Sequence, residues 1–417
     1  MVSKKVFDGI KIAEFAWAAV GPLTSKYLAE HGATVVRIES HKRVDILRST
    51  SPVVGKKPGA DNSMCYGRHN SNKYSVSIDL EHPRGRELAW KLIEWADIMT
   101  ESFSPRVMKK WGLDYDSVVE VKPDIIYLSS SMQGRGGPHS NYAGYGHNAA
   151  ALCGFSEISG WPDLAPAAPY GPYTDFVCPR FNATALIAAL EFRRRTGKGQ
   201  WIEQSQFETS LHFTAPMIMD FMVNERITSR QGNSLSNAAP HGLFPCQGDD
   251  RWVAIAVFTE LEWLNFCTAI GNPGLAQKAT FANLEQRKKN EKELESIVGK
   301  WTSKYTAQQV ENILQSAGIV ANIVSKPSDI YEDLQLKHRN YFTPLNHPVM
   351  GKQAFEPQSC FMLSKTPREV TMPSPCLGEH NLYVFKELLG MTDDEIADHI
   401  VDGSITTELA ADFHISM

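Results

Sequence analysis

The sequence lacks the short motifs by which several large enzyme classes are recognised. No GxGxxG follows its first predicted strand, and neither a GxxxxGK[ST] loop nor a GxSxG nucleophile turn is present. Such motifs bring the backbone close to phosphates or expose a nucleophilic serine. Their absence argues against a dinucleotide-binding protein, a P-loop nucleotidase and a serine hydrolase of the α/β type.

Cysteine and histidine occur without the spacings that mark metal or redox sites. The seven cysteines include no CxxC pair, and the thirteen histidines form neither HxxxH nor HxH. We therefore predict no bound metal, and we expect Cys153 and Cys178 to be buried structural thiols. Scattered, unpaired cysteines are typical of a reducing compartment, so the sequence predicts a cytoplasmic protein.

Long runs of one charge and long apolar runs are also absent. The net charge is −5, and no apolar run reaches the length needed to span a bilayer. The opening "MVSKKVFDGIKIAEF" has no continuous apolar segment of the kind found in signal peptides. We therefore expect no signal peptide, and neither a nucleic acid nor a membrane as partner.

The chain instead alternates strand-like and helix-like segments. β-branched stretches such as "TVVRIES" are interleaved with amphipathic ones such as "RGRELAWKLIEWA". This pattern predicts an α/β fold whose large domain has an open, mostly parallel sheet with flanking helices. The 417 residues exceed one typical core, and a loop rich in Gly, Asn and Pro follows residue 225. We predict a large domain over 1–225, a smaller α+β domain over 226–335 and a return to the large domain over 336–417.

One acid and one basic cluster stand out as candidates for chemistry. Asp175 precedes a helix that we predict to begin near Pro179, so it is either a cap or a nucleophile kept ionised by the helix dipole. Lys42 and Arg43 follow a predicted strand, where an anionic cofactor can bind, although a solvated charged loop has the same composition. A lone histidine such as His147 is more often structural than catalytic. The residues alone favour the cap, the solvated loop and the structural histidine.

Seven segments taken in order change this balance. They are "FDGIKIAEFAWAAVGPLTSKYLAEHGATVVRIES", "NKYSVSIDL", "ADIMTESFSPRVMKKWGLDYDSV", "EFRRRTGKGQWIEQSQFETSL", "RQGN", "GIVANIVSKPSDIYEDLQLKHRNYF" and "PCLGEH". Over nearly the whole chain they resemble the class III CoA-transferases. That family includes formyl-CoA transferases, carnitine CoA-transferases and α-methylacyl-CoA racemases. No single segment is decisive, but their order is specific.

The resemblance implies a reaction, a nucleophile and an assembly. The family's reacting aspartate lies fifteen residues before the end of a "LIAALE"-type segment, and counting back from Leu190 leads to Asp175. Asp175 would attack the thioester of an acyl-CoA donor, and CoA would reach a carboxylic acid acceptor through an aspartyl-CoA thioester. The resemblance also implies an interlocked dimer, built from two identical chains or from two related subunits.

Two other functions stay open. In racemases, the segment aligned with "AGYGHNAAALCG" carries His directly after "AG" and an Asp beside it, whereas this chain has Tyr145 and Gly146 there. Transferases carry a tyrosine at this place, so the resemblance favours a transferase over a racemase or epimerase. A non-catalytic partner subunit of a heteromeric transferase is the third candidate, and Asp175 argues against it.

The resemblance also implies where CoA binds. The suggested CoA contacts are Ala18, Ala19, Lys42, Arg43, Ser102, Phe103, Met108, Lys110 and Tyr145. The chain departs from the family pattern where Ala19 replaces a glutamine, Ser40 an arginine and Ser102 an asparagine. No glycine-rich gating loop is visible near 231–250.

For the substrate pocket we predict His147, Phe155 and Tyr173. Aromatic residues before Asp175 suit an aryl or other bulky acyl group, although ordinary packing uses the same residues. Among the branches of the family, the chain looks most like subunits of succinyl-CoA:benzylsuccinate CoA-transferases, which act in anaerobic aromatic degradation.

Overall fold

The computed structural model describes residues 5–57, 59–142 and 144–409. The chain divides into a large unit of residues 1–155, 168–225 and 338–417, and a small unit of residues 156–167 and 226–337. Sequence analysis had placed 156–167 in the large domain. The segment packs against the small unit, where the Trp161 ring fills the space beside Gly232. The Gly232 amide also donates to the Gly160 carbonyl at 2.9 Å.

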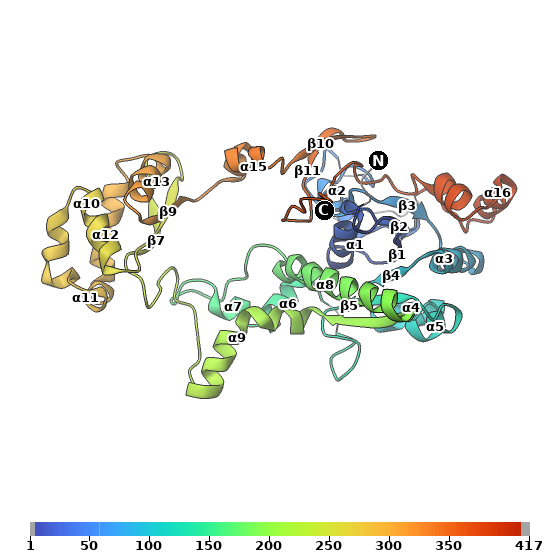
Figure 1. Ribbon diagram of the computed structural model, residues 1–417, viewed down its shortest axis with the longest axis horizontal. Coiled ribbons are helices and arrows are strands. Elements are labelled where there is room, and N and C mark those ends of the chain that lie inside the picture. The colour runs from blue at the N-terminus through green and yellow to red at the C-terminus, as the bar shows by residue number, and fades with distance from the viewer. Residues whose placement is uncertain (1–4, 58, 143, 410–417) are drawn as a thin grey trace. The chain divides into compact units, whose positions relative to one another are not determined.

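A six-stranded parallel sheet forms the centre of the large unit (Figure 1). All five neighbouring pairs are parallel, in the order β3-β2-β1-β4-β5-β6, which confirms the predicted α/β fold class. The strands are β1 (Lys11–Glu14), β2 (Thr34–Glu39), β3 (Tyr74–Ser77), β4 (Ile98–Glu101), β5 (Ile126–Ser131) and β6 (Gln200–Ser205). The strand order reverses between β1 and β4, and open sheets of this type bind ligands beyond the carboxyl ends of their strands at such a point.

Helices cover both faces of this sheet, because successive strand residues point to opposite sides. Ile12 and Ile126 pack with buried residues of α1 and α8 on one face. Ala13 and Tyr127 pack with buried residues of α3, α4 and α5 on the other. The bounds of these helices are α1 (Val20–Glu30), α3 (Pro83–Trp95), α4 (Pro105–Trp111), α5 (Tyr115–Val121) and α8 (Tyr173–Thr196).

Helix α8 begins earlier than the sequence predicted. Its first residue is Tyr173 and its N-cap is Pro172, so Asp175 lies inside the first turn and the predicted start near Pro179 is wrong. Pro179 lies in the interior of α8, where its missing N–H removes one backbone hydrogen bond of the helix, so this proline does not mark the boundary. Gly197 ends the helix with a φ of +73°, a left-handed conformation that glycine adopts at little cost.

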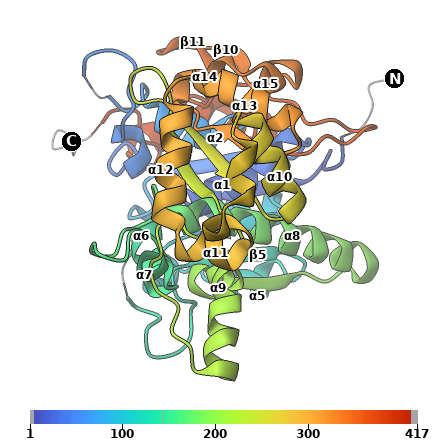
Figure 2. The same ribbon diagram turned by 90° about the vertical axis from the view of Figure 1, so that its left-hand side faces the viewer.

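The small unit has a three-stranded antiparallel sheet in the order β7-β8-β9. Its strands are β7 (His241–Pro245), β8 (Trp252–Ala256) and β9 (Val320–Ile323). Buried residues of α10 (Glu260–Ala269), α12 (Glu291–Thr302) and α13 (Ala307–Ser316) pack with it in one core, and Figure 2 shows these helices beside one another. Sequence analysis missed β7, because it lies in a stretch whose Gly, Asn and Pro content predicted a loop.

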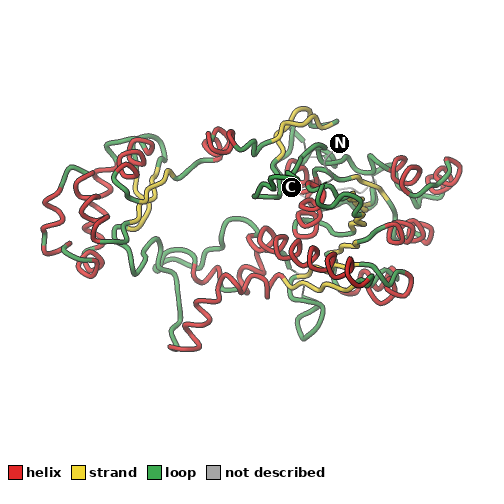
Figure 3. Tube along the Cα trace, viewed as in Figure 1, coloured by secondary structure: helices red, strands yellow, loops and turns green. Residues whose placement is uncertain are grey.

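The remaining elements connect and extend these cores. Residues 225–231 carry no regular structure after α9, as Figure 3 shows. Tyr383–Leu388 is a π-helical segment, and helix α16 (Asp393–Val401) follows it. In the described ranges, no helix is long and apolar enough to cross a membrane. The other elements are α2 (Met64–Asn70), α6 (Gly146–Leu152), α7 (Phe155–Ile158), α9 (Gln206–Asn224), α11 (Leu284–Lys289), α14 (Pro327–Glu332), α15 (Leu334–His338), β10 (Thr343–His347) and β11 (Gly351–Phe355).

Candidate active site

The Asp175 carboxylate lies beside the start of helix α6. A Cβ atom added to Gly146, the first residue of α6, would stand 2.7 Å from the Cγ and 2.7 Å from the Oδ1 of Asp175. Backbone N–H groups at a helix start have no partner within their own helix, so the Gly146 amide is available to this carboxylate. The missing side chain at residue 146 is what lets α6 approach the acid so closely.

A glutamine from helix α9 faces the same acid. Gln206 is the first residue after strand β6. The Thr174 hydroxyl lies 3.1 Å from the Gly146 carbonyl and 3.2 Å from the Gln206 Oε1, and donates to these acceptors. Because the Gln206 oxygen is turned towards Thr174, its NH₂ group is left to donate to Asp175. Asp175 thus lies between donors that come from two different helices.

Burial raises the pKa of Asp175 to about 6, against the lowering effect of hydrogen bonds from the Gly146 amide and the Gln206 side chain. The acid is still mainly a carboxylate at neutral pH, as the sequence predicted. The sequence predicted that the helix dipole keeps Asp175 ionised. The larger effect on its pKa is the loss of water around this partly buried acid. The carboxylate is therefore charged but poorly solvated.

The two cysteines near this site are inert thiols. Cys153 and Cys178 are both buried, as predicted. Burial raises the pKa of Cys178 to about 12 and also raises that of Cys153. A thiol that keeps its proton at neutral pH is a poor nucleophile, so Asp175 is the better candidate nucleophile here.

Aromatic rings surround the start of α8. Phe155 meets Tyr173 edge to face, with 5.2 Å between ring centroids, and Tyr173 meets Phe213 in the same way at 6.4 Å. Two of the three predicted substrate-pocket residues are thus in contact with each other. The third, His147, is exposed on the first turn of α6.

A separate cavity of about 440 Å³ opens at the carboxyl ends of strands β1 to β4. Three predicted CoA contacts, Lys42, Arg43 and Phe103, line it. The Phe103 ring lies 5.3 Å from the Trp17 ring and 5.5 Å from the Trp111 ring, so one wall is aromatic. This position is the switch point between β1 and β4, where ligands of such sheets bind.

The cavity also has acidic residues that sequence analysis missed. Asp79 and Glu81 line it, and each pairs with a lysine: Asp79 with Lys42 at 2.6 Å, and Glu81 with Lys110 at 2.7 Å. Lys110 does not line the cavity itself, but it pairs with Glu81, which does. Asp79 and Glu81 follow the end of β3, and Gln206 follows the end of β6. Their places at the carboxyl ends of strands were the signal by which the sequence could have identified them as site residues.

Other predicted contacts build the turn after β1. The Ser102 hydroxyl accepts from the Trp17 amide at 3.0 Å and donates to the Trp17 carbonyl at 3.1 Å. Ala18 has a φ of +59°, and its amide donates to the buried carboxylate of Asp45 at 2.9 Å. Ala19 is buried and is the N-cap residue of α1. None of these three residues lines the cavity; they hold the turn after β1 that carries Trp17, which does line it.

Two predicted CoA contacts lie elsewhere. Met108 is fully buried in the core of the large unit, so its predicted contact with CoA does not fit this structure. A long apolar side chain on the inner face of α4 fills the core. Tyr145 is 64% exposed and is the N-cap residue of α6, one residue before Gly146. Its place is beside Asp175 rather than in the cavity.

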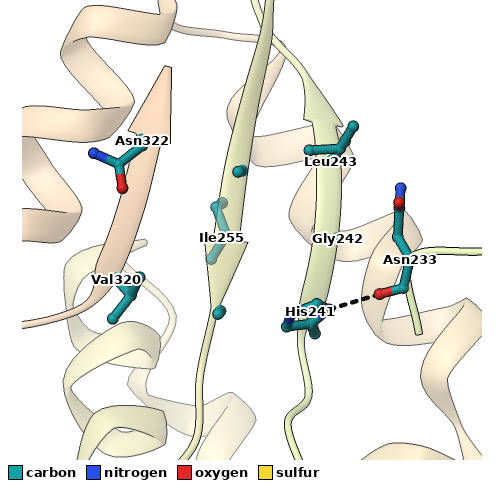
Figure 4. Close-up of a pocket in the computed structure, with 9 residues that line it drawn as sticks. Asn233, His241, Gly242, Leu243, Ile255, Val320 and Asn322 are labelled. Carbon is teal, nitrogen blue, oxygen red and sulfur yellow. Dashed lines mark hydrogen bonds between the residues drawn. The ribbon is translucent and has the colours of Figure 1, made fainter. Parts of the chain in front are cut away.

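The small unit has a pocket of its own, of about 140 Å³ (Figure 4). The His241 Nδ1 lies 2.6 Å from the Asn233 carbonyl, so it carries a proton and donates to that oxygen. None of the nine lining residues is an acid, so this pocket offers no nucleophilic carboxylate. Among the described residues, no group of three or more His, Cys, Asp or Glu is placed to hold a metal ion.

Comparisons with known proteins establish the family. The model of CoA-transferase family III matches residues 7–381. Succinyl-CoA–D-citramalate CoA-transferase of Chloroflexus aurantiacus is 29% identical over 393 residues, which cover 94% of this chain and 96% of that protein. The β subunit of succinyl-CoA–L-malate CoA-transferase from the same organism is 28% identical with the same coverage. A crystal structure of a CAIB/BAIF family protein from Brucella suis superimposes with a TM-score of 0.85 and 26% identity, covering 92% of this chain and all of that one. The chain is therefore an enzyme that belongs to family III of the CoA-transferases.

Proposed function

We propose that this chain transfers CoA through covalent intermediates on Asp175. A carboxylate oxygen attacks the donor thioester, the C–S bond breaks, and a mixed anhydride and CoA thiolate result. The thiolate attacks the Asp175 Cγ, the donor acid leaves as its carboxylate, and an aspartyl-CoA thioester remains. The acceptor carboxylate then attacks this Cγ and releases the thiolate, which attacks the acceptor's acyl carbon and frees Asp175. Each step exchanges one acyl bond for another, so no net proton is consumed.

The observation that carries this proposal is the surroundings of Asp175. Burial raises its pKa to about 6, so the acid is charged at neutral pH without being fully hydrated. A carboxylate that has lost part of its water shell attacks a carbonyl more readily than a solvated one. The Gly146 amide and the Gln206 side chain are fixed donors for the negative charge that develops on its oxygens, which is where donors of this kind lower a barrier.

The cavity at β1–β4 is our proposed site for the nucleotide part of CoA. Lys42 and Arg43 supply positive charge, and Phe103, Trp17 and Trp111 supply rings for an adenine. Phe103 follows β4 and Gln206 follows β6, two strand spacings or about 10 Å apart in a parallel sheet. An extended pantetheine arm is longer than this distance and reaches from the cavity to Asp175.

We propose succinyl-CoA as the donor and an aryl-substituted dicarboxylate such as benzylsuccinate as the acceptor. Both relatives described above carry names in which succinyl-CoA is the donor. The Phe155, Tyr173 and Phe213 rings around the start of α8 give the acceptor's aromatic group a surface to pack against. The transferase is favoured over a racemase because His147 is exposed and the two positions before it are Tyr145 and Gly146.

Trapping with hydroxylamine tests this proposal. The full chain is incubated with succinyl-CoA and hydroxylamine, which cleaves thioesters and anhydrides, and its peptides are analysed by mass spectrometry. We expect a hydroxamate at Asp175 and none in the Asp175→Asn variant. Asp116 is the control, because it also lies in the first turn of a helix, α5, but is exposed; it is expected to stay unmodified.

Several outcomes of this experiment are informative. An active protein that is never modified at Asp175 contradicts the covalent mechanism. Exchange of the donor's α-proton with solvent deuterium, without transfer of CoA, contradicts the transferase and supports a racemase. Activity that arises only when a second chain is added supports a heteromer. Two relatives are named as the α and β subunits of one transferase.

A further inference from the structure

The last described residues of the chain are bound into the edge of the large sheet. The family match ends at residue 381, whereas the chain continues through α16 to a short extended segment at 404–406. Ile405 forms an antiparallel bridge with Ile78, just after β3. The Asp79 amide donates to the Ser404 carbonyl at 2.9 Å, and the Thr406 amide donates to the Ser77 carbonyl at 3.1 Å. Ser404–Thr406 therefore serves as an added strand at this edge.

Thr406 also reaches the turn that follows β2. The His41 amide lies 3.0 Å from the Thr406 Oγ1 and 3.0 Å from the Ser77 Oγ, and donates to both. The Ser77 hydroxyl is itself hydrogen-bonded to the Thr406 hydroxyl and lies 2.6 Å from the His41 Nδ1. All three residues are buried, so these bonds are shielded from water. The Thr406 hydroxyl is thus a direct link between the C-terminal segment and the turn at residue 41.

The C-terminal segment fixes the backbone on both charged sides of the proposed CoA cavity, the basic side at Lys42 and Arg43 and the acidic side at Asp79. Lys42 and Arg43 follow His41 directly and line the cavity, as does Asp79. Lys42 pairs with Asp79 at 2.6 Å, and its side chain is 57% exposed. One partner of this ion pair is fixed through His41 to Thr406, and the other is fixed through its amide to Ser404. An exposed lysine gains affinity for phosphate when its backbone is already held in place.

We propose that Thr406 is a positioning residue for CoA, which fixes the turn carrying Lys42 and Arg43 and so increases affinity for the phosphate groups of the cofactor. This inference rests on the proposed function, because it takes the cavity at β1–β4 to be the CoA site. It assigns a role to a part of the chain that lies outside the family match. Thr406 touches neither the reacting acid nor its donors, so its effect falls on binding and not on the chemical step.

Isothermal titration of the full chain with CoA tests the proposal. Thr406→Val keeps the shape of the side chain and removes the hydroxyl. Because one buried hydrogen bond contributes on the order of 1 kcal/mol, we expect the Kd for CoA to rise about three- to tenfold. Thr406→Ser restores the hydroxyl and is expected to bind CoA as the native chain does. Thr407→Val is the matched control, since Thr407 is the next residue and is exposed.

A second readout separates positioning from a general loss of structure. The rate of hydroxamate formation at Asp175 is followed as succinyl-CoA is increased: Thr406→Val is expected to raise the half-saturating concentration and leave the plateau rate within about twofold of the native value. Equal Kd values for Thr406→Val and Thr407→Val overturn the proposal, as does failure of Thr406→Ser to restore binding. If Thr406→Val does not fold, Ser77→Ala removes the hydroxyl on the other side of the same cluster; native CoA binding by that variant overturns the proposal.

Failure of this inference is distinguishable from failure of the proposed function. Lys42→Ala is expected to weaken CoA binding if the cavity is the CoA site. Native binding by Lys42→Ala contradicts the site itself, whereas weak binding by Lys42→Ala with native binding by Thr406→Val contradicts only the role of Thr406. Titration with CoA does not depend on Asp175, so it stands whether or not the hydroxamate forms.

Discussion

Asp175 has its properties because of the residues that surround it in space, few of which are its neighbours in sequence. From the sequence, this acid in a turn before a helix was a cap or a nucleophile. In the fold it is inside the first turn of α8, and Pro172 is the N-cap residue. Its carboxylate faces Gly146 and Gln206, which are twenty-nine and thirty-one residues away in the sequence. These contacts argue against the cap, because the acid does not cap its own helix, and the nucleophilic role stays our proposal.

The raised pKa of Asp175 predicts how activity depends on pH. Burial raises the pKa to about 6, and only the carboxylate attacks a thioester, so kcat/KM for succinyl-CoA is expected to fall about tenfold per pH unit below pH 6. Gln206→Leu removes a donor that lowers this pKa, so its acid limb is expected to move to higher pH. A hydrogen bond to a charged group contributes about 1.5 kcal/mol, which corresponds to a loss of about tenfold below pH 6.

A glutamine of the small unit serves as the control for this profile. Gln308 is exposed on α13 of the small unit, and Gln308→Leu is expected to leave the acid limb unchanged. If Gln206→Leu and Gln308→Leu have the same profile as the native chain, Gln206 does not donate to Asp175.

At the scale of elements, the close approach of α6 and α8 depends on a single glycine. A Cβ at residue 146 would lie 2.7 Å from the Asp175 Cγ and 2.7 Å from the Pro172 Cβ. Gly146→Ala must therefore push the two helix starts apart, and overpacking of this kind costs about 1–3 kcal/mol. We expect the rate of hydroxamate formation at Asp175 to fall at least about tenfold, with a lower melting temperature.

Gly136 provides the matched alanine substitution. It lies in the loop after β5, and nothing is within 4 Å of a Cβ placed there. Gly136→Ala is expected to keep native rates. A Gly146→Ala variant as active as Gly136→Ala shows that the acid does not require the approach of α6.

The sequence predicted much of the order of helices and strands, but fewer of the residues that surround Asp175. Period-two and helical patterns predicted the strands of the large sheet and the helices α1, α3 and α8, because each buries one face. The strand β7 was missed, since its edge position tolerates Gly and Pro that otherwise predict a loop. Lys42 and Arg43 were predicted because they follow a strand, and Phe103 because of the family resemblance; all three line the cavity. Gly146 and Gln206 were not predicted, because only the tertiary fold brings them to Asp175.

At the scale of the whole molecule, the large unit leaves apolar surface uncovered. The end of helix α9 carries Met222 and Val223, which are 75% and 78% exposed, beside Met219 and Phe221 at 62% and 54%. Adjacent large apolar residues on one exposed helix are a feature of interfaces. They support the interlocked dimer that the family resemblance implies, and this assembly stays a prediction.

Substitutions at two exposed valines, Val223 on α9 and Val401 on α16, test the predicted dimer. Val223→Lys places a charge on the exposed end of α9 and is expected to shift the protein from dimer towards monomer in sedimentation velocity, with loss of activity. Val401→Lys makes the same change at an 87% exposed valine of α16 and is expected to leave the dimer intact. A native chain that sediments as a stable, active monomer contradicts the predicted assembly.

Oxygen transfer through Asp175 tests the central claim most directly. The acceptor acid is labelled with ¹⁸O in its carboxylate, the protein turns over with succinyl-CoA, and the peptide that contains Asp175 is weighed by mass spectrometry. In the proposed mechanism the oxygen that bridges the second anhydride remains on the aspartate when the acceptor leaves as its CoA thioester. We therefore predict ¹⁸O in the Asp175 carboxylate and, after further turnovers, in the released succinate. Label that reaches succinate while Asp175 stays unlabelled would show that the acyl groups never bond to this residue, and would contradict the account.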